Sequence, residues 1–326
     1  MCTVMRPHCL VLASSLQRRL YPFLPNSNLV LGTGSTSPPP HSMSILKQPL
    51  KLALVQLATG ADKAANLARA RTKIVEAAKA GANVVVLPEC FNSPYGTNFF
   101  PQYAESLTPP SASQSFSALS AIAKETSTYL IGGSIPEVDP ATQKLYNTSL
   151  VFSPAGELLA THRKIHLFDI DIPGKIRFKE SEVLSPGDSM TVVDTEYGKI
   201  GLGICYDVRF PELAMTAARK GCFAMVYPGA FNMTTGSLHW SLLARARAVD
   251  NQIYVALCSP ARDTSASYHA WGHSMVVDPN GEVMQELEDS EGMIIAELRD
   301  ERVQEVRKGI PVTTQRRFDV YKDVAN

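Results

Sequence analysis

Apolar residues from about residue 49 to 320 follow two alternating patterns. Short continuous apolar runs, such as Leu50–Ala58 and Asn83–Leu87, are typical of strands that are buried on both faces. Asp62–Ala80 instead carries apolar residues at helical spacing and ends before Gly81. Further strands are expected at 128–135, 145–152, 157–165, 223–227, 252–258, 273–278, 282–288 and 292–298, and further helices at 115–126, 211–220, 237–251 and 300–308. This alternation predicts one layered α/β domain.

A sharp turn between a strand and a helix is predicted within residues 199–213, which read KIGLGICYDVRFPEL. The strand ends near Cys205. Pro211 and Glu212 then suit the first turn of a helix, where a missing N–H costs nothing and a negative charge is favoured. An elbow of this kind exposes a side chain next to backbone N–H groups. Cys205 is therefore either a nucleophile or, as free cysteines often are, a small apolar residue of the core.

The first 46 residues differ from the rest, because they contain arginines and serines but no acidic residue. This segment ends in a stretch rich in Gly, Ser and Pro at 32–42, which does not suit a packed core. We expect residues 1–46 to be an N-terminal extension, either a mitochondrial transit peptide or a disordered tail, and residues 47–326 to form the domain. Met43 would be an internal start for a cytosolic form, so the expected location is mitochondrial, cytoplasmic or both.

The composition is that of an ordinary globular chain without a strong charge bias. The chain has 326 residues, 45% of them apolar, and a formal net charge of zero. Without a broad basic surface, nucleic acid and anionic membranes are not expected as main partners. No apolar run approaches the roughly 18 residues of a membrane-spanning helix. The six cysteines form no CxxC pair, so we expect no metal site of the zinc type and a reducing compartment.

Three charged residues lie where they could act with Cys205. Glu89 directly follows a buried strand, where α/β sheets bind ligands, and burial there would raise its pKa towards that of a general base. Lys164 closes an apolar strand and could stabilise an oxyanion or protonate a leaving amine. Taken alone, Glu89 could equally be a capping or loop carboxylate, and Lys164 a surface lysine with a buried stem. Glu180 lies in the irregular segment 166–189, where a solvated role is the default.

A cysteine–histidine dyad is the alternative mechanism for a nucleophilic thiol. The candidate histidines are His166, His239 and His273. His239 lies beside a tryptophan at the start of an apolar helix, which favours a capped or packed ring. No aspartate or asparagine that would orient the ring is evident from the sequence.

Glu89, Lys164 and Cys205, in this order, resemble the Glu–Lys–Cys triad of the nitrilase superfamily. The resemblance covers residues 51–320. Its motifs are LPECFNSPYG at 87–96, HRKIHLFDIDIPGK at 162–175, GLGICYDVRFPEL at 201–213, YPGAFNMTTG at 227–236 and RARAVDNQIYVA at 245–256. The residues of these motifs, together with SPARD at 259–263 and AWGHS at 270–274, are most similar to the omega-amidase branch. The resemblance implies a single-domain α/β fold, a four-layer α-β-β-α sandwich, and leaves the first 46 residues outside.

The resemblance also implies roles for the site residues. Cys205 would be the nucleophile, Glu89 the general base and Lys164 the group that stabilises the oxyanion. Glu180 would orient the lysine, and the backbone N–H of Tyr206 would be a second oxyanion donor. A carboxylate and an ammonium around one thiol would balance the charge of the site, and the lysine would favour the thiolate. No metal or organic cofactor is implied. The family usually pairs subunits through the elbow helix and the C-terminal region, so a homodimer is the expectation, and Leu213, Met215 and Ala217-Ala218 of the helix at 211–220 would suit a face covered by the partner.

The omega-amidase branch implies hydrolysis of 2-oxoglutaramate and 2-oxosuccinamate to 2-oxoglutarate or oxaloacetate plus ammonia, through a cysteine thioester. The carboxylate of such a substrate needs a cation or several polar donors. Tyr95, Arg209 and Arg262 lie in or next to the motifs and are the candidates. Arg209 could instead pair with Glu212 or Asp207. Arg262 could instead be a surface residue.

Other functions stay open at this point. Within the superfamily, the chain could act on another small acid amide, such as deaminated glutathione or a carbamoyl compound, or on a nitrile. A non-catalytic partner protein that kept the fold is the alternative from a different class. The presence of Glu89, Lys164, Glu180 and Cys205 together counts against it.

Overall fold

The structure is a computed structural model that describes residues 45–174 and 176–325. The described part from Ile45 onwards belongs to one compact unit. The expected transit peptide or tail at residues 1–46 lies almost wholly outside the described residues and stays a prediction. No helix of the described residues is long and apolar enough to span a membrane.

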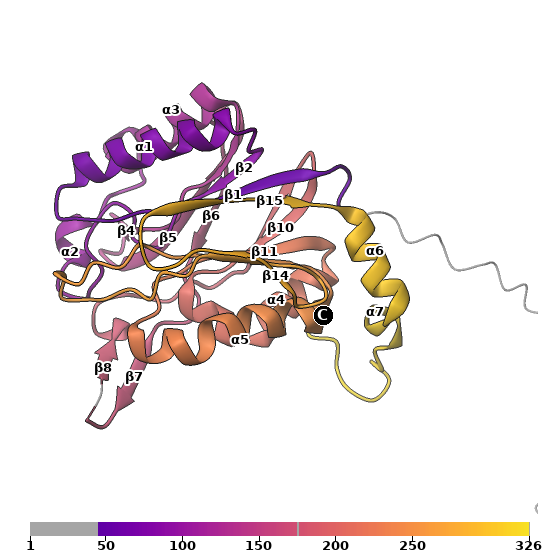
Figure 1. The fold of residues 1–326 in the computed structure, drawn as a ribbon. Coiled ribbons are helices and arrows are strands. Elements are labelled where there is room, and N and C mark those ends of the chain that lie inside the picture. The colour runs from indigo at the N-terminus through magenta and orange to yellow at the C-terminus, as the bar shows by residue number, and fades with distance from the viewer. Residues whose placement is uncertain (1–44, 175, 326) are drawn as a thin grey trace, which may run out of the picture. The chain divides into compact units, whose positions relative to one another are not determined.

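Two β-sheets form the centre of the molecule (Figure 1). The first has the strand order β15-β1-β2-β3-β5-β4, and β6 pairs with β5. The second has the order β14-β13-β12-β11-β10-β9. The strands of the first are β1 (Leu50–Gln56), β2 (Val84–Val86), β3 (Tyr129–Ile131), β4 (Ile135–Val138), β5 (Leu145–Phe152), β6 (Leu158–Arg163) and β15 (Gly292–Leu298). Those of the second are β9 (Thr191–Thr195), β10 (Gly198–Leu202), β11 (Cys222–Pro228), β12 (Tyr254–Cys258), β13 (Met275–Val277) and β14 (Val283–Glu286).

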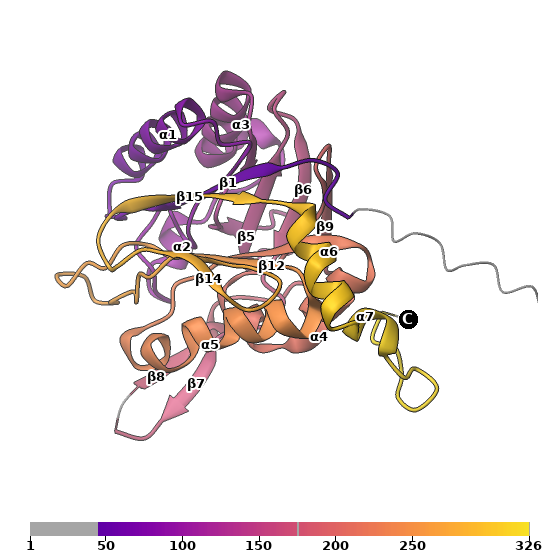
Figure 2. The ribbon, with the colours of Figure 1, turned by 45° about the vertical axis from the view of Figure 1, so that its right-hand side comes forward.

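Helices cover the outer face of each sheet (Figures 1 and 2). Helices α1 (Lys63–Lys79) and α3 (Gln114–Thr126) cover the first sheet, and α4 (Pro211–Arg219) and α5 (Met233–Asn251) cover the second. Between the sheets, apolar side chains such as Leu54 of β1 and Val226 of β11 belong to one buried cluster. The predicted α-β-β-α sandwich is therefore confirmed.

The central strands of both sheets run parallel, and this positions the site. In the first sheet, β1, β2 and β3 are parallel neighbours; in the second, β10, β11 and β12 are. Glu89 follows β2, Cys205 follows β10 and Ala230 follows β11. Residues that directly follow parallel strands lie together at the carboxyl ends of those strands, which is where α/β folds bind ligands.

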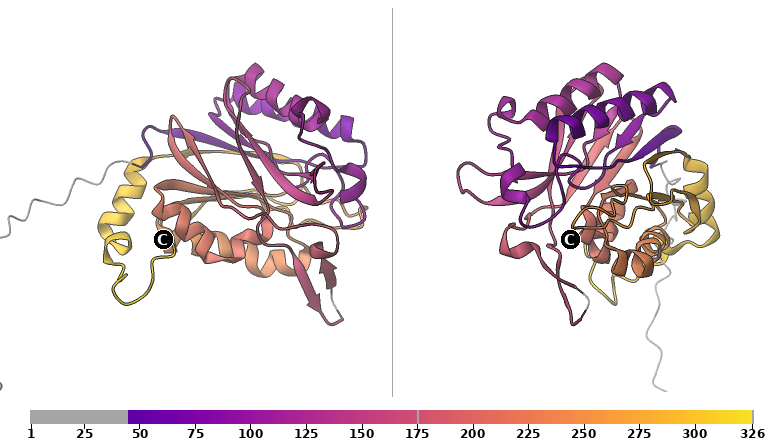
Figure 3. Two further views of the ribbon diagram at one scale, coloured as in Figure 1. Left: turned by 180° about the vertical axis from the view of Figure 1, so that it is seen from behind. Right: turned by 60° about the vertical axis from the view of Figure 1, so that its left-hand side comes forward.

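The segment 166–189 is more regular than its polar sequence predicts. It forms an antiparallel hairpin of β7 (Asp169–Ile172) and β8 (Ile176–Lys179), which projects from the layers (Figures 1 and 3), followed by a 3-10 turn at Glu180–Glu182. The predicted strand 128–135 is divided into β3 and β4. At the break, a Cβ on Gly133 would lie 2.1 Å from the Pro88 carbonyl oxygen, so only glycine fits.

The remaining differences concern element ends and short elements. Helix α5 begins at Met233 rather than at 237, because the Asn232 side chain caps it by accepting a hydrogen bond from the Thr235 N–H at 2.9 Å. Strand β9 and the one-turn helices α2 (Phe100–Tyr103) and α7 (Val312–Gln315) were not predicted. Helix α6 (Asp300–Gly309) matches the predicted helix at 300–308.

Candidate active site

Cys205 lies at the predicted elbow. It follows β10, begins the 3-10 turn Cys205–Arg209, and is followed by α4, whose first residue is Pro211. Its φ of +50° is in the left-handed region, which is costly for a residue with a side chain and recurs at functional turns. Gly203 permits the close turn, since a Cβ there would lie 2.5 Å from the Tyr227 ring. The elbow places the buried thiol of Cys205 near Glu89, at the carboxyl ends of the parallel strands.

Glu89 follows β2 in the chain and is fully buried. Its carboxylate accepts hydrogen bonds from Asn147 Nδ2 at 2.8 Å, Lys164 Nζ at 3.0 Å and the Ala230 N–H at 2.7 Å. The Cys205 thiol lies close enough to Glu89 to lower its pKa. Burial raises the pKa of Glu89 above its ordinary value, and Lys164 offsets this only in part. The alternative of a capping or solvated loop carboxylate is wrong.

Lys164 is 1% exposed and lies between two carboxylates. Its Nζ is 3.0 Å from Glu89 Oε1 and 2.9 Å from Glu180 Oε1. Burial alone would lower its pKa, but Glu180 and then Glu89 outweigh burial, and the pKa is raised well above its ordinary value. Lys164 is therefore an ammonium held in the interior, and the alternative of a surface lysine is wrong.

Glu180 is also fully buried, so the default of a solvated role is wrong. It accepts hydrogen bonds from the Tyr95 hydroxyl at 2.8 Å and from the Phe168 N–H at 2.7 Å. These bonds leave Glu180 well placed to fix the ammonium of Lys164.

The thiol of Cys205 is not pre-ionised. Burial and then the charge of Glu89 raise its pKa well above the ordinary value, and Lys164 opposes them without prevailing. Lys164 does favour the thiolate, as expected, because it lowers the pKa of Cys205, but burial and Glu89 outweigh it. The resting arrangement is a neutral thiol beside a carboxylate, as a cysteine activated by a general base requires.

Asp207 joins the elbow to the strand end that carries Lys164. This buried carboxylate accepts hydrogen bonds from the Ile204 N–H at 2.9 Å and the His166 N–H at 2.8 Å. His166 Nδ1 at 2.8 Å and His162 Nε2 at 3.4 Å also contact it. Burial raises its pKa, but the bonds from the two histidines prevail and lower it far below its ordinary value. No local pattern predicts this role, because His162 and His166 become neighbours of Asp207 only in the fold.

The described contacts of the candidate histidines do not include the thiol. His166 contacts Asp207, His239 Nδ1 lies 3.2 Å from an Arg209 nitrogen, and His273 Nδ1 lies 3.0 Å from Glu286 Oε1. Within the described residues, the group placed to take the proton of Cys205 is a carboxylate rather than an imidazole.

A cavity of about 230 Å³ adjoins the cluster. Tyr95, Ala230 and Tyr268 are among its lining residues. The Tyr268 hydroxyl donates to the Ala230 carbonyl oxygen at 2.5 Å, and the N–H of the same residue holds Glu89. Tyr268 is thus a site residue that no motif in the sequence indicates. The cavity is further lined by Thr59, Gly60, Ala61, Pro94, Phe99, Pro260, Ala261, Asp263, Ala266, Ser267 and Ala270.

The two candidate arginines differ in their surroundings. The Arg209 guanidinium lies 4.8 Å from the Phe231 ring centre and 5.5 Å from that of Tyr206. Burial lowers its pKa, against the opposing effect of Cys205. Among the described residues it forms no ion pair with a carboxylate, so the suggested pairing with Glu212 or Asp207 is wrong.

Arg262 has its donors already engaged. Its guanidinium lies 2.6 Å from Asp289 Oδ2 and donates to the carbonyl oxygens of Ala270 and Trp271. Arg209 is therefore the candidate cation that remains available to an anionic substrate.

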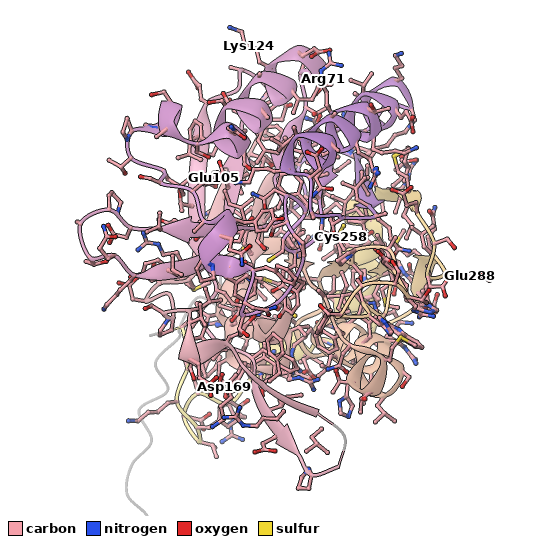
Figure 4. All side chains as sticks on the ribbon, turned by 90° about the vertical axis from the view of Figure 1, so that its left-hand side faces the viewer. Arg71, Glu105, Lys124, Asp169, Cys258 and Glu288 are labelled. Atoms are coloured by element: carbon pink, nitrogen blue, oxygen red, sulfur yellow. The ribbon has the colours of Figure 1, made fainter. Side chains whose placement is uncertain are left out.

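The other described cysteines are packed in the interior. Cys90, Cys222 and Cys258 are buried and free. Cys258 lies between the sheets (Figure 4), where its thiol contacts the carbonyl oxygens of Val55 and Val86 at 3.5 Å. No group of His, Cys, Asp and Glu in the part of the chain that the structure describes is arranged to hold a metal ion.

Comparisons with known proteins show the family of the chain. The model of the carbon-nitrogen hydrolase family matches residues 51–308. The chain is 57% identical over 283 residues to omega-amidase NIT3 of Saccharomyces cerevisiae, covering 86% of this chain and 97% of that protein. It is 58% identical over 271 residues to omega-amidase NIT2 of Mus musculus, covering 83% and 96%.

A solved structure is similar over the same region. The crystal structure of Saccharomyces cerevisiae Nit3, described as a member of branch 10 of the nitrilase superfamily, superposes with a TM-score of 0.78 at 54% identity, covering 84% of this chain and 98% of that one. With the family model matching most of the chain, the protein belongs to the carbon-nitrogen hydrolase family, in the omega-amidase branch of the nitrilase superfamily, and is a hydrolase of amide carbon–nitrogen bonds.

Proposed function

We propose that this protein is an omega-amidase that hydrolyses the terminal amide of 2-oxoglutaramate and 2-oxosuccinamate. The observation that carries the proposal is the buried cluster of Glu89, Lys164 and Cys205, with an arginine beside it that has no carboxylate partner among the described residues. The names of the relatives, omega-amidases NIT3 and NIT2, support the same activity.

In the first half of the reaction, Glu89 takes the proton of Cys205 and the sulfur attacks the amide carbon. The oxygen of the tetrahedral intermediate becomes negative, and the Lys164 ammonium and the Tyr206 N–H stabilise it. Tyr206 lies in the first turn of a 3-10 helix, where N–H groups have no acceptor within the helix. The carbon–nitrogen bond then breaks, the proton passes from Glu89 to the nitrogen, and ammonia leaves a thioester on Cys205.

In the second half, Glu89 takes a proton from water and the resulting hydroxide attacks the thioester carbon. The same oxyanion donors stabilise the second tetrahedral intermediate. The carbon–sulfur bond breaks, the carboxylic acid is released, and the proton held by Glu89 returns to the thiolate. The raised pKa of Glu89 suits this work, because a base must hold the proton between the two transfers.

Arg209 would bind the carboxylate of the substrate. A guanidinium packed over Phe231 and Tyr206 is partly shielded from water, and this strengthens its interaction with an anion. Tyr95 would act indirectly, by holding Glu180 against Lys164.

The proposed assembly and location rest on the family and the leader. Of the face expected on the elbow helix, Leu213 and Ala217 are buried in the core of this chain and are not free to contact a partner. A homodimer is the proposed state, and helix α5 supports it because Leu238, Leu242 and Val249 lie on one face and are 65%, 61% and 50% exposed. Residues 1–46 would direct one form to mitochondria, and a shorter form would stay in the cytoplasm.

Ammonia release and intact-protein mass spectrometry together test the proposal. Release from 2-oxoglutaramate should far exceed release from deaminated glutathione, nitriles or N-carbamoyl amino acids. A transient acyl mass should map to the peptide that contains Cys205, and the Cys205→Ala variant should show neither signal. Equal or reversed rates among these substrates would refute the omega-amidase assignment, and an adduct elsewhere would refute the nucleophile.

A further inference from the structure

Tyr268, in the segment between β12 and β13, lines the cavity and lies close to the catalytic cluster. Its ring centre is 4.5 Å from that of Tyr95, which lines the same cavity. Its hydroxyl donates to the Ala230 carbonyl oxygen at 2.5 Å. Burial raises the pKa of Tyr268 well above its ordinary value, so the hydroxyl stays a donor throughout the working pH range. Ala230 is therefore the residue through which this hydroxyl can act on the cluster.

Ala230 contacts both the base and the nucleophile. Its N–H donates to Glu89 Oε2 at 2.7 Å and lies close enough to Cys205 to lower the pKa of the thiol. The preceding residue, Gly229, passes so close to the elbow that a Cβ there would lie 3.1 Å from the Cys205 Cα. One backbone N–H thus faces the two groups between which the proton moves. A donor in this position stabilises whichever of the two is negative.

The hydroxyl of Tyr268 restrains Ala230 from its other side. The N–H and the carbonyl group of Ala230 belong to the two peptide groups that flank its Cα, so a bond to one limits the movement of the other. The neighbouring residues have bonds of their own: the Gly229 N–H donates to the Cys258 carbonyl oxygen at 2.9 Å, and the Phe231 carbonyl oxygen accepts from the Trp271 N–H at 2.7 Å. Without the hydroxyl, the path of the chain should therefore persist and Ala230 alone should gain freedom.

We propose that Tyr268 is a positioning residue for the proton transfer between Cys205 and Glu89. Its hydroxyl keeps the Ala230 N–H directed at both groups and thereby favours their negative forms. Tyr268 itself transfers no proton. The inference rests on the proposed function, in which Glu89 is the base and Cys205 the nucleophile.

Tyr268→Phe tests this role, because it keeps the ring and removes only the hydroxyl. The kcat for 2-oxoglutaramate should fall about 3- to 10-fold, as for the loss of one neutral hydrogen bond, with little change in KM. The acid limb of the kcat/KM profile should move to higher pH, since Glu89 loses a donor that favours its carboxylate. The other titratable groups that face Glu89 stay in place; they are Lys164, Glu180, Cys205, Cys90 and Tyr95.

Alkylation of Cys205 by iodoacetamide is a second measurement, which does not depend on the amide that the enzyme hydrolyses. Peptide mass spectrometry follows its rate as a function of pH. In Tyr268→Phe the rate at pH 7 should fall about threefold or more, and the whole pH dependence should move to higher pH, because the thiolate also loses a donor. If the wild type does not hydrolyse 2-oxoglutaramate but this shift is found, the proposed substrate is wrong and the role of Tyr268 stands.

Tyr254→Phe is the matched control. Tyr254 is buried in β12, and its hydroxyl donates to the Arg299 carbonyl oxygen at 2.9 Å, a bond of the same type. This variant should leave kcat, the acid limb and the alkylation profile unchanged. A lower kcat in Tyr268→Phe with an unmoved acid limb and unmoved alkylation would overturn the proposal, as would equal shifts in the two variants or no change in Tyr268→Phe.

Discussion

The ammonium of Lys164 is shared by two buried carboxylates, and this sharing sets the pH range of the reaction. Glu89 must be ionised to accept a proton, and Lys164 must stay protonated to stabilise the oxyanion. Glu180 raises the pKa of both residues: after burial and Lys164, it is the next influence on Glu89, and it is the main cause that raises the pKa of Lys164. Activity should therefore fall when the pH drops below the raised pKa of Glu89, and again when the pH rises above the higher pKa of Lys164.

Glu180→Gln removes this shared negative charge. Because the charge raises both pKa values, its loss should lower both, and the acid and alkaline limbs of the kcat/KM profile should both move to lower pH. Tyr95→Phe is the control, since it removes a hydrogen bond to Glu180 but leaves the charge. A profile of Glu180→Gln that keeps the wild-type limbs would contradict the assigned electrostatics.

Arg209 should determine the preference for anionic substrates. Arg209→Gln is expected to lower kcat/KM for 2-oxoglutaramate by about 10- to 100-fold, the range for losing one charge-assisted hydrogen bond. A neutral short-chain amide should be hydrolysed as well as by the wild type. Arg262→Gln is the matched control and should leave the preference intact, because that side chain is bound to Asp289 and to two carbonyl oxygens. Equal losses for both substrates with Arg209→Gln would refute carboxylate binding there.

At the scale of elements, the elbow after β10 and the end of β6 are held together by Asp207. Asp207→Asn keeps the size of the side chain, but its amide nitrogen is a donor that meets the donors from Ile204 and His166. We expect a loss of about 2–4 kcal/mol in the free energy of unfolding and a fall in kcat of about tenfold or more, with little change in KM.

The pH dependence of unfolding distinguishes this residue further. The folded pKa of Asp207 is lowered, so its contribution to stability is present above the unfolded pKa of about 3.9 and is lost as the pH falls towards the folded value. The unfolding free energy of Asp207→Asn should fall less steeply with acid than that of the wild type. Glu137→Gln is the control. It alters the buried ion-pair partner of Arg163, the last residue of β6. A similar loss of kcat in both variants would mean general destabilisation.

The sequence predicted the strands and helices that are buried, because a buried strand is a continuous apolar run and a packed helix has apolar residues at helical spacing. It did not predict the β7–β8 hairpin, whose polar, Pro- and Gly-containing residues look irregular when read singly. Nor did local pattern reveal that Glu180 is buried, since Tyr95, which satisfies it, is 85 positions earlier in the chain. Burial of a polar residue depends on distant partners that the neighbouring residues do not indicate.

At the scale of the whole molecule, the described residues from Ile45 onwards belong to one compact unit. A variant that starts at Met43 should fold and keep a kcat/KM close to that of the full chain. Circular dichroism and ammonia release would check this. Failure to fold would refute the interpretation of the leader as a targeting segment or tail.

The prediction on assembly concerns the exposed apolar face of α5 formed by Leu238, Leu242 and Val249. Leu238→Glu and Leu242→Glu should shift the protein from dimer to monomer in light scattering, because a buried charge opposes association. Leu158→Glu is the control, on β6, where the native side chain is 42% exposed. A wild-type monomer, or variants that stay dimeric, would refute this face as the interface.

The ion pair between Lys164 and Glu180 closes the segment that contains the β7–β8 hairpin. Because both ends of that segment are fixed in the interior, its projecting part can change in length and sequence without displacing either charge. The hairpin is thus a natural place for loop grafting. Exchanging it between relatives offers a way to alter substrate range while the chemical machinery is inherited intact.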